Sequence, residues 1–209
     1  MECVVQGIIE TQHVEALEIL LQGLCGVRKQ GLRIHELCLK SVPNLGSVES
    51  KIQLVCDLEK PEDTWTVRHV GGPMIGSGAE KSSFLVRPVQ ESKITKNAQI
   101  FFKNIGYKLD HKHLRVGFAF HFQKDALITV TVSSINKIFK LHAIDDAVSV
   151  TPGTHLVEVT AQTASTNYNE VVASVSSFCE YLALLLHLSK PGVSTGVVPT
   201  AVASLMSDG

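Results

Sequence analysis

Hydrophobic and polar residues alternate along most of the chain, in short segments that end at turn-forming residues. Alternation of this kind places one set of side chains on each face of a β-strand. The clusters of Gly, Pro, Ser, Asn or charged residues between the segments are typical of turns. The strand-like segments are residues 1–9, 32–42, 50–60, 64–72, 82–92, 106–122, 127–139 and 154–162. The pattern predicts seven or eight antiparallel strands, with a bulge at Ser133–Ser134 where the alternation slips.

Three segments have helical spacing instead. The first begins near Thr11 and ends at Gly26, the second is short and covers about 97–104, and the third begins at Asn167 and ends at Lys190. Asn167 with Glu170 three residues later resembles a capping box. Strands framed by helices predict an α+β fold, here an antiparallel curved β-barrel flanked by an N-terminal helix, a short middle helix and a long C-terminal helix. We expect residues 1–190 to form a single domain and 191–209 a disordered tail.

Composition narrows the class of protein. The chain has 209 residues, 44% hydrophobic and 19% charged, with a formal net charge of −1. Its acids and bases are interspersed, so no basic stripe for direct nucleic-acid binding stands out. Five cysteines occur without a CxxC pair, no signal peptide is apparent, and no apolar run reaches the ~20 residues of a membrane span. These features predict a soluble protein from a reducing compartment, with no disulfide framework and no membrane segment.

The stretch GYKLDHKHLRVGFAFHF, residues 106–122, is the main candidate for chemistry. As a strand it divides its side chains between two faces. The polar face carries His111, His113, Arg115 and His121, and the other carries Leu114, Val116, Phe118, Phe120 and Phe122. Two histidines at i and i+2 can present imidazoles to zinc, but a third ligand is required. The sequence places none of its candidates, His69, His142 or His155, so we expect an ordinary polar strand face with no metal and no cofactor.

Known catalytic patterns are missing. Neither GxSxG nor GxxxxGK[ST] occurs, and no catalytic residue is assigned. A polar barrel interior raises the alternative of a metal-dependent phosphohydrolase of the triphosphate-tunnel type, which needs clustered inward carboxylates and bases. Its ExExK signature is absent, the nearest approach being VESK at Val48–Lys51. The sequence shows only single charges on separate strands, namely Glu36, Glu158, Arg68 and Arg87. A clustered tunnel lining would favour this enzyme, and a scattered lining a scaffold. A third alternative is an apolar ligand lined by residues 118–122.

The end of the C-terminal helix suggests a partner. Residues 181–188 are apolar nearly all the way round, so such a helix is buried on more than one side. Either its own domain or another protein covers it. Tyr181, Leu184 and Leu188 are the candidate partner-binding residues.

Several short segments, taken together, resemble one family. They are VVQGII, LQGLCG, IGYKLDHKHLRVGFAFHF, THLVEV and LLLHLSK, in this order along residues 1–190. In this combination the chain resembles the subunit 18 family of the Mediator complex. Residues 106–110 and 117–120 match that family's Gly-aromatic-x-x-Asp and Gly-x-x-Phe patterns, which belong to barrel geometry and not to catalysis.

The resemblance implies a function that the residue patterns alone do not. It implies a curved barrel distantly similar to triphosphatase tunnels but without their activity. It also implies a non-catalytic, nuclear coactivator subunit that pairs with subunit 20 and binds a C-terminal helix of subunit 8. These form part of the Mediator head, which bridges regulators to RNA polymerase II.

Overall fold

The computed structural model describes most of the chain. The described residues are 1–26, 28–43, 50–60, 64–74, 83–95, 97–123, 125–139, 144–163 and 168–192. The helical segments among them are η1 (Thr11–His13), α1 (Val14–Cys25), α2 (Ala98–Asn104) and α3 (Tyr168–Leu182). The strands are β1 (Glu2–Glu10), β2 (Gln30–Ser41), β3 (Lys51–Asp57), β4 (Trp65–Val70), β5 (Leu85–Arg87), β6 (Val89–Ile94), β7 (Tyr107–Gln123), β8 (Leu127–Lys137), β9 (Val148–Ser149) and β10 (Thr154–Gln162). The predicted tail falls outside these ranges except for Pro191 and Gly192, so its disorder stays a prediction.

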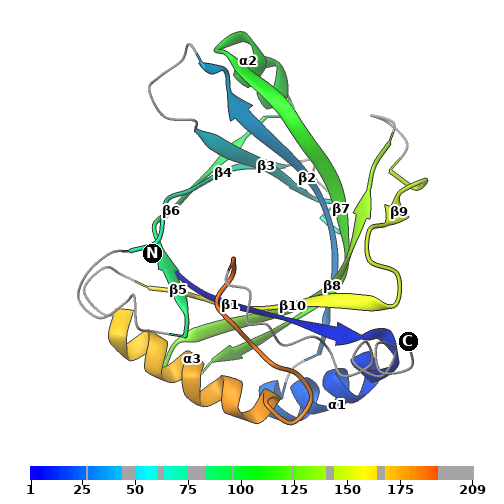
Figure 1. Cartoon of the computed structure of the whole chain (residues 1–209), viewed down its shortest axis with the longest axis vertical. Helices are drawn as coiled ribbons and strands as arrows, with labels where there is room; N and C mark the ends of the chain where they lie inside the picture. The colour runs from blue at the N-terminus through cyan, green and yellow to red at the C-terminus, as the bar shows by residue number, and fades with distance from the viewer. Residues whose placement is uncertain are drawn as a thin grey trace, which may run out of the picture.

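The strands form one antiparallel sheet that curls into a nearly closed barrel (Figure 1). Their order is β5-β1-β10-β8-β7-β2-β3-β4-β6, with β9 paired to β8 beside this path. β5 and β6 are the two edges of the sheet, and only Pro88 separates them in sequence. Proline suits this position because it has no N–H to donate to a strand ladder. Its carbonyl accepts the N–H of Gly71 at 2.9 Å, which joins the end of β4 to the junction. The predicted α+β barrel with three flanking helices is confirmed.

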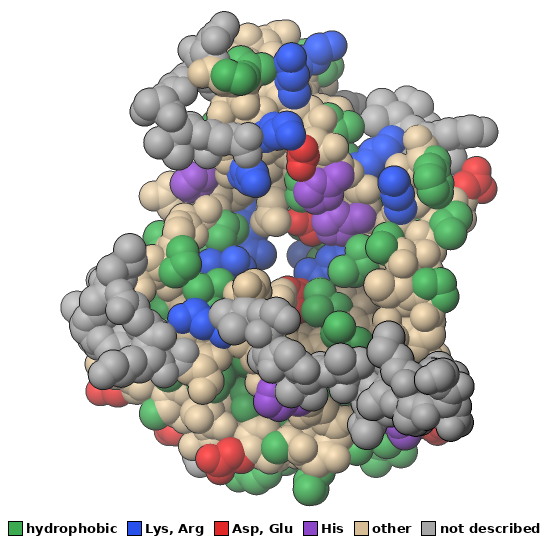
Figure 2. All heavy atoms as spheres, viewed as in Figure 1, with side chains coloured by type: hydrophobic (Ala, Val, Ile, Leu, Met, Phe, Trp, Pro, Cys, Tyr) green, Lys and Arg blue, Asp and Glu red, His purple; other side chains and the backbone are tan. Residues whose placement is uncertain are grey.

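An opening runs through the middle of the molecule, and charged side chains gather around it (Figure 2). The long strand β7 shows how the sequence produces this polar interior. Arg115 and His121 point inward, where Arg115 meets Glu158 of β10 and His121 meets Thr129 of β8. The polar face predicted for this strand is therefore present, but it lines the barrel.

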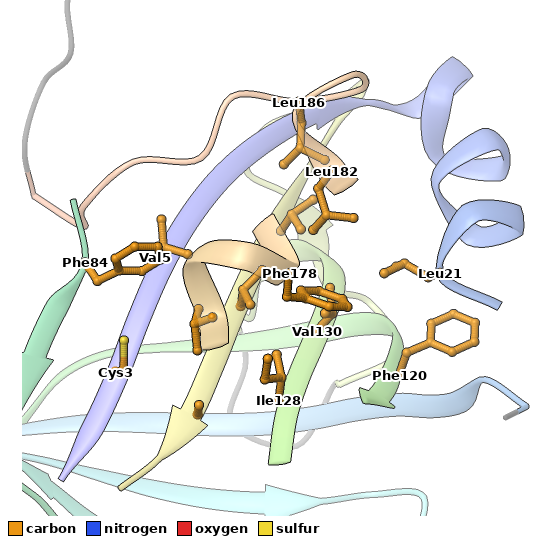
Figure 3. Close-up of a cluster of buried hydrophobic side chains, with 14 of the residues drawn as sticks. Cys3, Val5, Leu21, Phe84, Phe120, Ile128, Val130, Phe178, Leu182 and Leu186 are labelled. Atoms are coloured by element: carbon orange, nitrogen blue, oxygen red, sulfur yellow. The ribbon is translucent and has the colours of Figure 1, made fainter. Parts of the chain in front are cut away.

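The main hydrophobic core lies outside the barrel wall, between the strands and the helices α1 and α3 (Figure 3). Phe120 is 1% exposed, and the ring of Phe122 lies 4.9 Å from the ring of Phe178 on α3. A second cluster, which includes Leu54 of β3, packs beneath α2. Phe120 and Phe122 thus pack on the helix side of the wall and not on the barrel interior, and Phe122 also borders a groove along α3, so they give no support to an apolar ligand inside the barrel.

The N-terminal helix follows its sequence pattern. Leu17 and Leu21, four residues apart, are both fully buried on the face that meets the barrel. Gly26 ends the helix in the left-handed region with φ 63°, and its N–H donates to the carbonyl of Gln22 at 3.0 Å. The predicted stop at Gly26 is confirmed, because glycine adopts this conformation without a steric cost.

The C-terminal helix is shorter than predicted. It ends at Leu182, and residues 183–189, here called the C-terminal strap, leave it through turns and become extended. Ser189 exchanges two backbone hydrogen bonds with Gln6 of β1, at 2.7 and 2.9 Å. Leu186 is buried with the core while Leu184 is 91% exposed. The all-round apolar pattern therefore marks a change from helix to strap. The predicted capping residue Asn167 lies outside the described residues.

Two strand details also differ from prediction. The segment 82–92 divides at Pro88 into β5 and β6. The pairing of β8 with β7 runs unbroken through Ser133 and Ser134, so no bulge interrupts that register. The register shift lies instead between Cys38 and Leu39 of β2, opposite β7.

We expect Gly7→Ala to detach the C-terminal strap. A Cβ at this position would lie 2.6 Å from the backbone oxygen of His187 and 2.9 Å from Leu186 Cδ1. Because backbone cannot yield cheaply, the two hydrogen bonds to Ser189 should be lost, lowering the free energy of unfolding by about 2 kcal/mol or more. Chemical denaturation and amide exchange at Gln6 measure this.

Gly23→Ala is the matched control. A Cβ there meets nothing within 4 Å, and the residue lies inside α1. It should stabilise the protein by up to about 1 kcal/mol. Equal stability of the two variants would contradict the role given to Gly7.

Candidate functional site

Two hollows line the inner wall of the barrel, and both are rich in charge. The first, about 450 Å³, lies over β3, β4 and β6 and includes Arg68, Glu91 and Lys93. The second, about 320 Å³, lies over β2, β7 and β10 and includes Glu36 and Glu158. Together with the opening in Figure 2 they make the barrel interior a charged tunnel. A functional site in such a tunnel depends on which of these charges are free to meet a ligand.

Glu2 joins the two ends of the curled sheet. Its carboxylate, 5% exposed, lies between Arg68 of β4 and Arg87 of β5. Arg87 donates from Nε and Nη2 to Oε2 of Glu2, at 3.1 and 3.0 Å, and Arg68 bonds to the other oxygen. The Nε of Arg68 lies 3.2 Å from Glu91 Oε1. β5 and β6 form no ladder with each other, and only isolated backbone hydrogen bonds, from Gly71 to Pro88 and from Met74 to Val86, cross the junction, so this ion-pair cluster reinforces the closure of the barrel.

A second network crosses the wall from β7 to β1. Arg115 donates to Glu158 and to the hydroxyls of Thr131 and Ser133, at 3.3 and 3.2 Å for the hydroxyls. Gln6 Nε2 donates to the other oxygen of Glu158 at 2.6 Å. The guanidinium and carboxylate are 16% and 15% exposed. Both charges are therefore compensated within the wall.

A third group lies at the mouth of the tunnel, where β2 meets β7. His113 Nε2 lies 3.1 Å from Glu36 Oε2, and His111 Nδ1 lies 2.9 Å from Asp110 Oδ2. Burial alone would raise the pKa of Glu36, but the hydrogen bond from His113 and nearby positive charges outweigh it, so this pKa is lowered. Hydrogen bonds from Lys40 and then His111 lower the pKa of Asp110 to about 2. Both carboxylates are therefore ionised at neutral pH.

Cys38 completes this group and was not anticipated as a member of it. Its Sγ and one ring nitrogen from each of His111 and His113 lie within 4.8 Å of one another. Burial, followed by the charges of Glu36 and Asp110, raises the pKa of the Cys38 thiol to about 12. Like the other cysteines it forms no disulfide.

The third ligands considered from sequence do not join the cluster. His69 is exposed on β4, and His155 lies near Thr11 at 3.4 Å. His142 lies outside the described residues. The alternation along residues 32–42 predicts that Cys38 lies on a strand. It does not predict the register of that strand against β7, which places Cys38 opposite His111.

The three candidate partner-binding residues occupy different environments. Leu184 is 91% exposed and Tyr181 is 53% exposed. Tyr181 borders a groove of about 430 Å³ along α3, with Phe122 and Asp125 on its other side. Leu188 is half-buried, packs against the core, and borders a groove of about 290 Å³ on the opposite side of α3.

Further exposed apolar residues escaped the sequence analysis because single apolar residues carry no periodic signal. Ile100 and Phe101 on α2 are 61% and 58% exposed. Phe139 and Val148, near β8 and β9, are 66% and 56% exposed. None of the described helices is long and apolar enough to cross a bilayer.

The tunnel lining is clustered, contrary to the view of single charges on separate strands. Glu2 gathers Arg68 and Arg87, and Arg115 gathers Glu158. Clustering alone is the feature expected of a phosphohydrolase. In these clusters, however, the arginines and carboxylates bind one another, whereas triphosphate chemistry needs carboxylates that hold metal and bases that hold phosphate. Fold and site together define a tunnel-type antiparallel β-barrel in which the inward carboxylates of Glu2 and Glu158 are paired with arginines.

Comparison with known proteins places this barrel in a family. The chain is 68% identical over 212 residues to Mediator of RNA polymerase II transcription subunit 18 from Arabidopsis thaliana, covering 100% of this chain and 97% of that protein. At this identity over the full length, the chain belongs to the Mediator subunit 18 family. The predicted family is confirmed. No protein-family model matches the chain.

Solved structures agree on the fold. A chain of the Schizosaccharomyces pombe Mediator head module matches with a TM-score of 0.73 and 15% identity, over 90% of this chain and 98% of that one. The PH1819 protein of Pyrococcus horikoshii matches with a TM-score of 0.56 and 13% identity, over 87% and 90%. A Hippeastrum putative adenylyl cyclase, described as having a dominant triphosphatase activity, matches with a TM-score of 0.51 and 10% identity, over 93% of each chain. At these identities the likeness concerns the barrel alone.

We expect Glu2→Gln to weaken the closure of the barrel. The amide keeps the shape of the side chain but removes the buried carboxylate between the two half-buried guanidinium groups, so that Arg87 loses its ion pair and Arg68 keeps only Glu91. Breaking a buried ion pair on one side costs about 3 kcal/mol or more. Chemical denaturation measures the loss, and amide exchange at β5 and β6 should rise first.

Glu10→Gln, at the other end of the same strand, is the control. Glu10 takes part only in a local, exposed hydrogen bond from Gln12 among the described contacts, so its replacement should change stability by about 0.5 kcal/mol or less. If Glu2→Gln has the stability of the wild-type protein, the ion-pair cluster at Glu2 does not hold the barrel closed.

Proposed function

We propose that this protein is a non-catalytic structural subunit of the Mediator coactivator, within its head module. The observation that carries the proposal is the 68% identity over the whole chain to the Arabidopsis Mediator subunit 18. The match to a chain of the Schizosaccharomyces pombe head module supports the same role at the level of fold. The protein works in transcription by holding other subunits in place, in the nucleus. Through that assembly it bridges regulators to RNA polymerase II.

The proposed partners are the barrel of Mediator subunit 20 and a C-terminal helix of subunit 8, as the family resemblance implies. A helix binds a protein surface by laying its apolar face into a groove. The grooves on both sides of α3 have suitable chemistry, since their apolar members include Phe122 and Tyr181 on one side and Phe84 and Leu188 on the other. We place the partner contact at Tyr181 and Leu184, with Leu188 at its edge.

Exposure separates the roles of these three residues. The side chain of Leu184 contributes little to the stability of the fold, because the residue is 91% exposed. Leu188 is half-buried and comes close to Gly7, where its Cδ2 would lie 3.1 Å from an added Cβ. A polar residue at Leu188 would disturb the C-terminal strap as well as any contact. Tyr181 and Leu184 are therefore the positions where binding can be tested without unfolding.

The second candidate function is a metal-dependent phosphohydrolase. The charged tunnel and the Hippeastrum protein with triphosphatase activity favour it. Two observations weigh against it. The inward carboxylates of Glu2 and Glu158 are bound by arginines, and the chain lacks the ExExK pattern. We therefore assign the tunnel charges to the stability of the wall.

We expect Tyr181→Lys with Leu184→Lys to separate the protein from its Mediator partners. The test is purification from nuclear extract through an affinity tag on this chain, followed by identification and quantification of the recovered subunits. The wild-type protein should recover the other head subunits in comparable amounts. The double variant should recover at least about tenfold less of the directly bound subunit, because two cations would be buried against an apolar face.

Ile100→Lys controls for a new charge at an exposed apolar position, on α2 at the other end of the barrel (Figure 1). This variant should recover the same amount of the subunit that binds at Tyr181 and Leu184 as the wild-type protein does. All variants should keep the wild-type melting temperature within a few degrees. Undiminished recovery with the double variant would remove α3 as the contact. Failure of the wild-type chain to recover Mediator subunits would contradict the proposed function itself.

A further inference from the structure

The mouth of the tunnel brings a cysteine and two histidines together from neighbouring strands. Cys38 on β2 is the register partner of His111 on β7, and His113 lies two residues further along the same face. One ligand atom from each of the three side chains lies within 4.8 Å of the other two. We propose that Cys38, His111 and His113 bind a zinc ion that ties β2 to β7.

The distances suit a site that closes around its ion. With Zn–S bonds of about 2.3 Å and Zn–N bonds of about 2.0 Å, tetrahedral ligand atoms lie roughly 3.3–3.6 Å apart. The present spacing of up to 4.8 Å is wider by roughly 1.2–1.5 Å at most, which side-chain rotation can close. The strand register already fixes the backbones, so no rearrangement of the sheet is needed.

The contacts around the histidines have the arrangement that zinc ligands use. A metal-bound histidine commonly donates its other ring N–H to a carboxylate, which orients the ring. Here His113 meets Glu36 at 3.1 Å and His111 meets Asp110 at 2.9 Å, each through one ring nitrogen. The two rings are stacked, with centroids 5.8 Å apart and an angle of 14° between their planes. Each imidazole is therefore held in place with one nitrogen left over.

The local charges also suit a divalent cation. Lys40 pairs with Asp110 at 2.7 Å, and Arg115 pairs with Glu158. This leaves Glu36, with a Cys38 thiolate, to balance the two positive charges of the ion. The Cys38 thiol donates to Glu36 Oε1 at 4.0 Å, and a bound cation would release this proton and stabilise the resulting thiolate beside the carboxylate.

The donor set selects zinc over the metals of phosphate chemistry. Thiolate and imidazole favour zinc, whereas magnesium and manganese prefer oxygen ligands. Three protein donors leave one position for water. Because the ligands come from two strands beside the register shift at Cys38 and Leu39, the ion would fasten the sheet where its ladder is irregular. This role is independent of the proposed function in Mediator.

The test uses the full-length chain purified without a polyhistidine tag, treated with a chelator and then titrated with Zn²⁺ alone. We expect about one tightly bound zinc per chain by elemental analysis after dialysis, and a higher melting temperature with zinc than without. Cys38→Ser and His113→Gln should each lower the affinity at least about 100-fold. Cys25→Ser and His121→Gln are the matched controls and should leave it unchanged, since neither residue belongs to the cluster.

Cobalt binding to the wild-type chain provides a measurement that needs no variant. Co²⁺ in the proposed site should give a sulfur-to-cobalt charge-transfer band and the strong visible bands of a tetrahedral ion, and added Zn²⁺ should remove both. Substoichiometric zinc, the same zinc affinity in Cys38→Ser, or a cobalt spectrum without the sulfur band would each overturn the proposal.

Discussion

A barrel with buried charges on its inner wall is stable only if each buried charge lies beside an opposite one. Glu2 meets this constraint where the sheet is weakest, because β5 and β6 form no ladder and the carboxylate bonds to arginines from both sides of the gap. Arg115 and Glu158 do the same between β7 and β10. An unpaired charge at these depths would cost several kcal/mol, so the pairs are a condition for the tunnel to exist.

Once charge occupies the inside of the barrel, the hydrophobic core has to lie outside it. Phe120 of β7 and Phe178 of α3 are each 1% exposed in that outer core. The C-terminal strap extends this cover by pairing Ser189 with Gln6 on β1. Helix α3 then has one face in the core and another, with Tyr181, turned outward, and Leu184 at the start of the C-terminal strap is also exposed. An arrangement with charges inside the barrel and the hydrophobic core outside it thus leaves an apolar outer surface to which other proteins can bind.

Local pattern predicts a large part of this fold and much less of its sites. Alternation places Phe120 and Arg115 on opposite faces, and a glycine after the last helical residue predicts the end of α1 at Gly26. Both features depend only on residues nearby in the sequence. Sequence pattern predicts too long a helix α3 because the C-terminal strap that follows it bonds to β1, over 180 residues earlier in the chain, and local pattern does not show this contact. Glu2 and Cys38 were missed for the same reason, since their partners meet them only through strand register.

The central claim is that the tunnel charges serve the barrel wall and that function lies on the outer surface. The most direct measurement is Mediator-dependent transcription in a nuclear extract depleted of the endogenous subunit and supplied with the variant Arg115→Gln plus Glu158→Gln. This double change removes a charge pair as a unit and keeps hydrogen-bonding groups in place. We predict wild-type transcription at equal amounts of folded, incorporated protein. Loss of transcription by a variant that folds and joins the complex normally would contradict the claim and assign the tunnel a direct function.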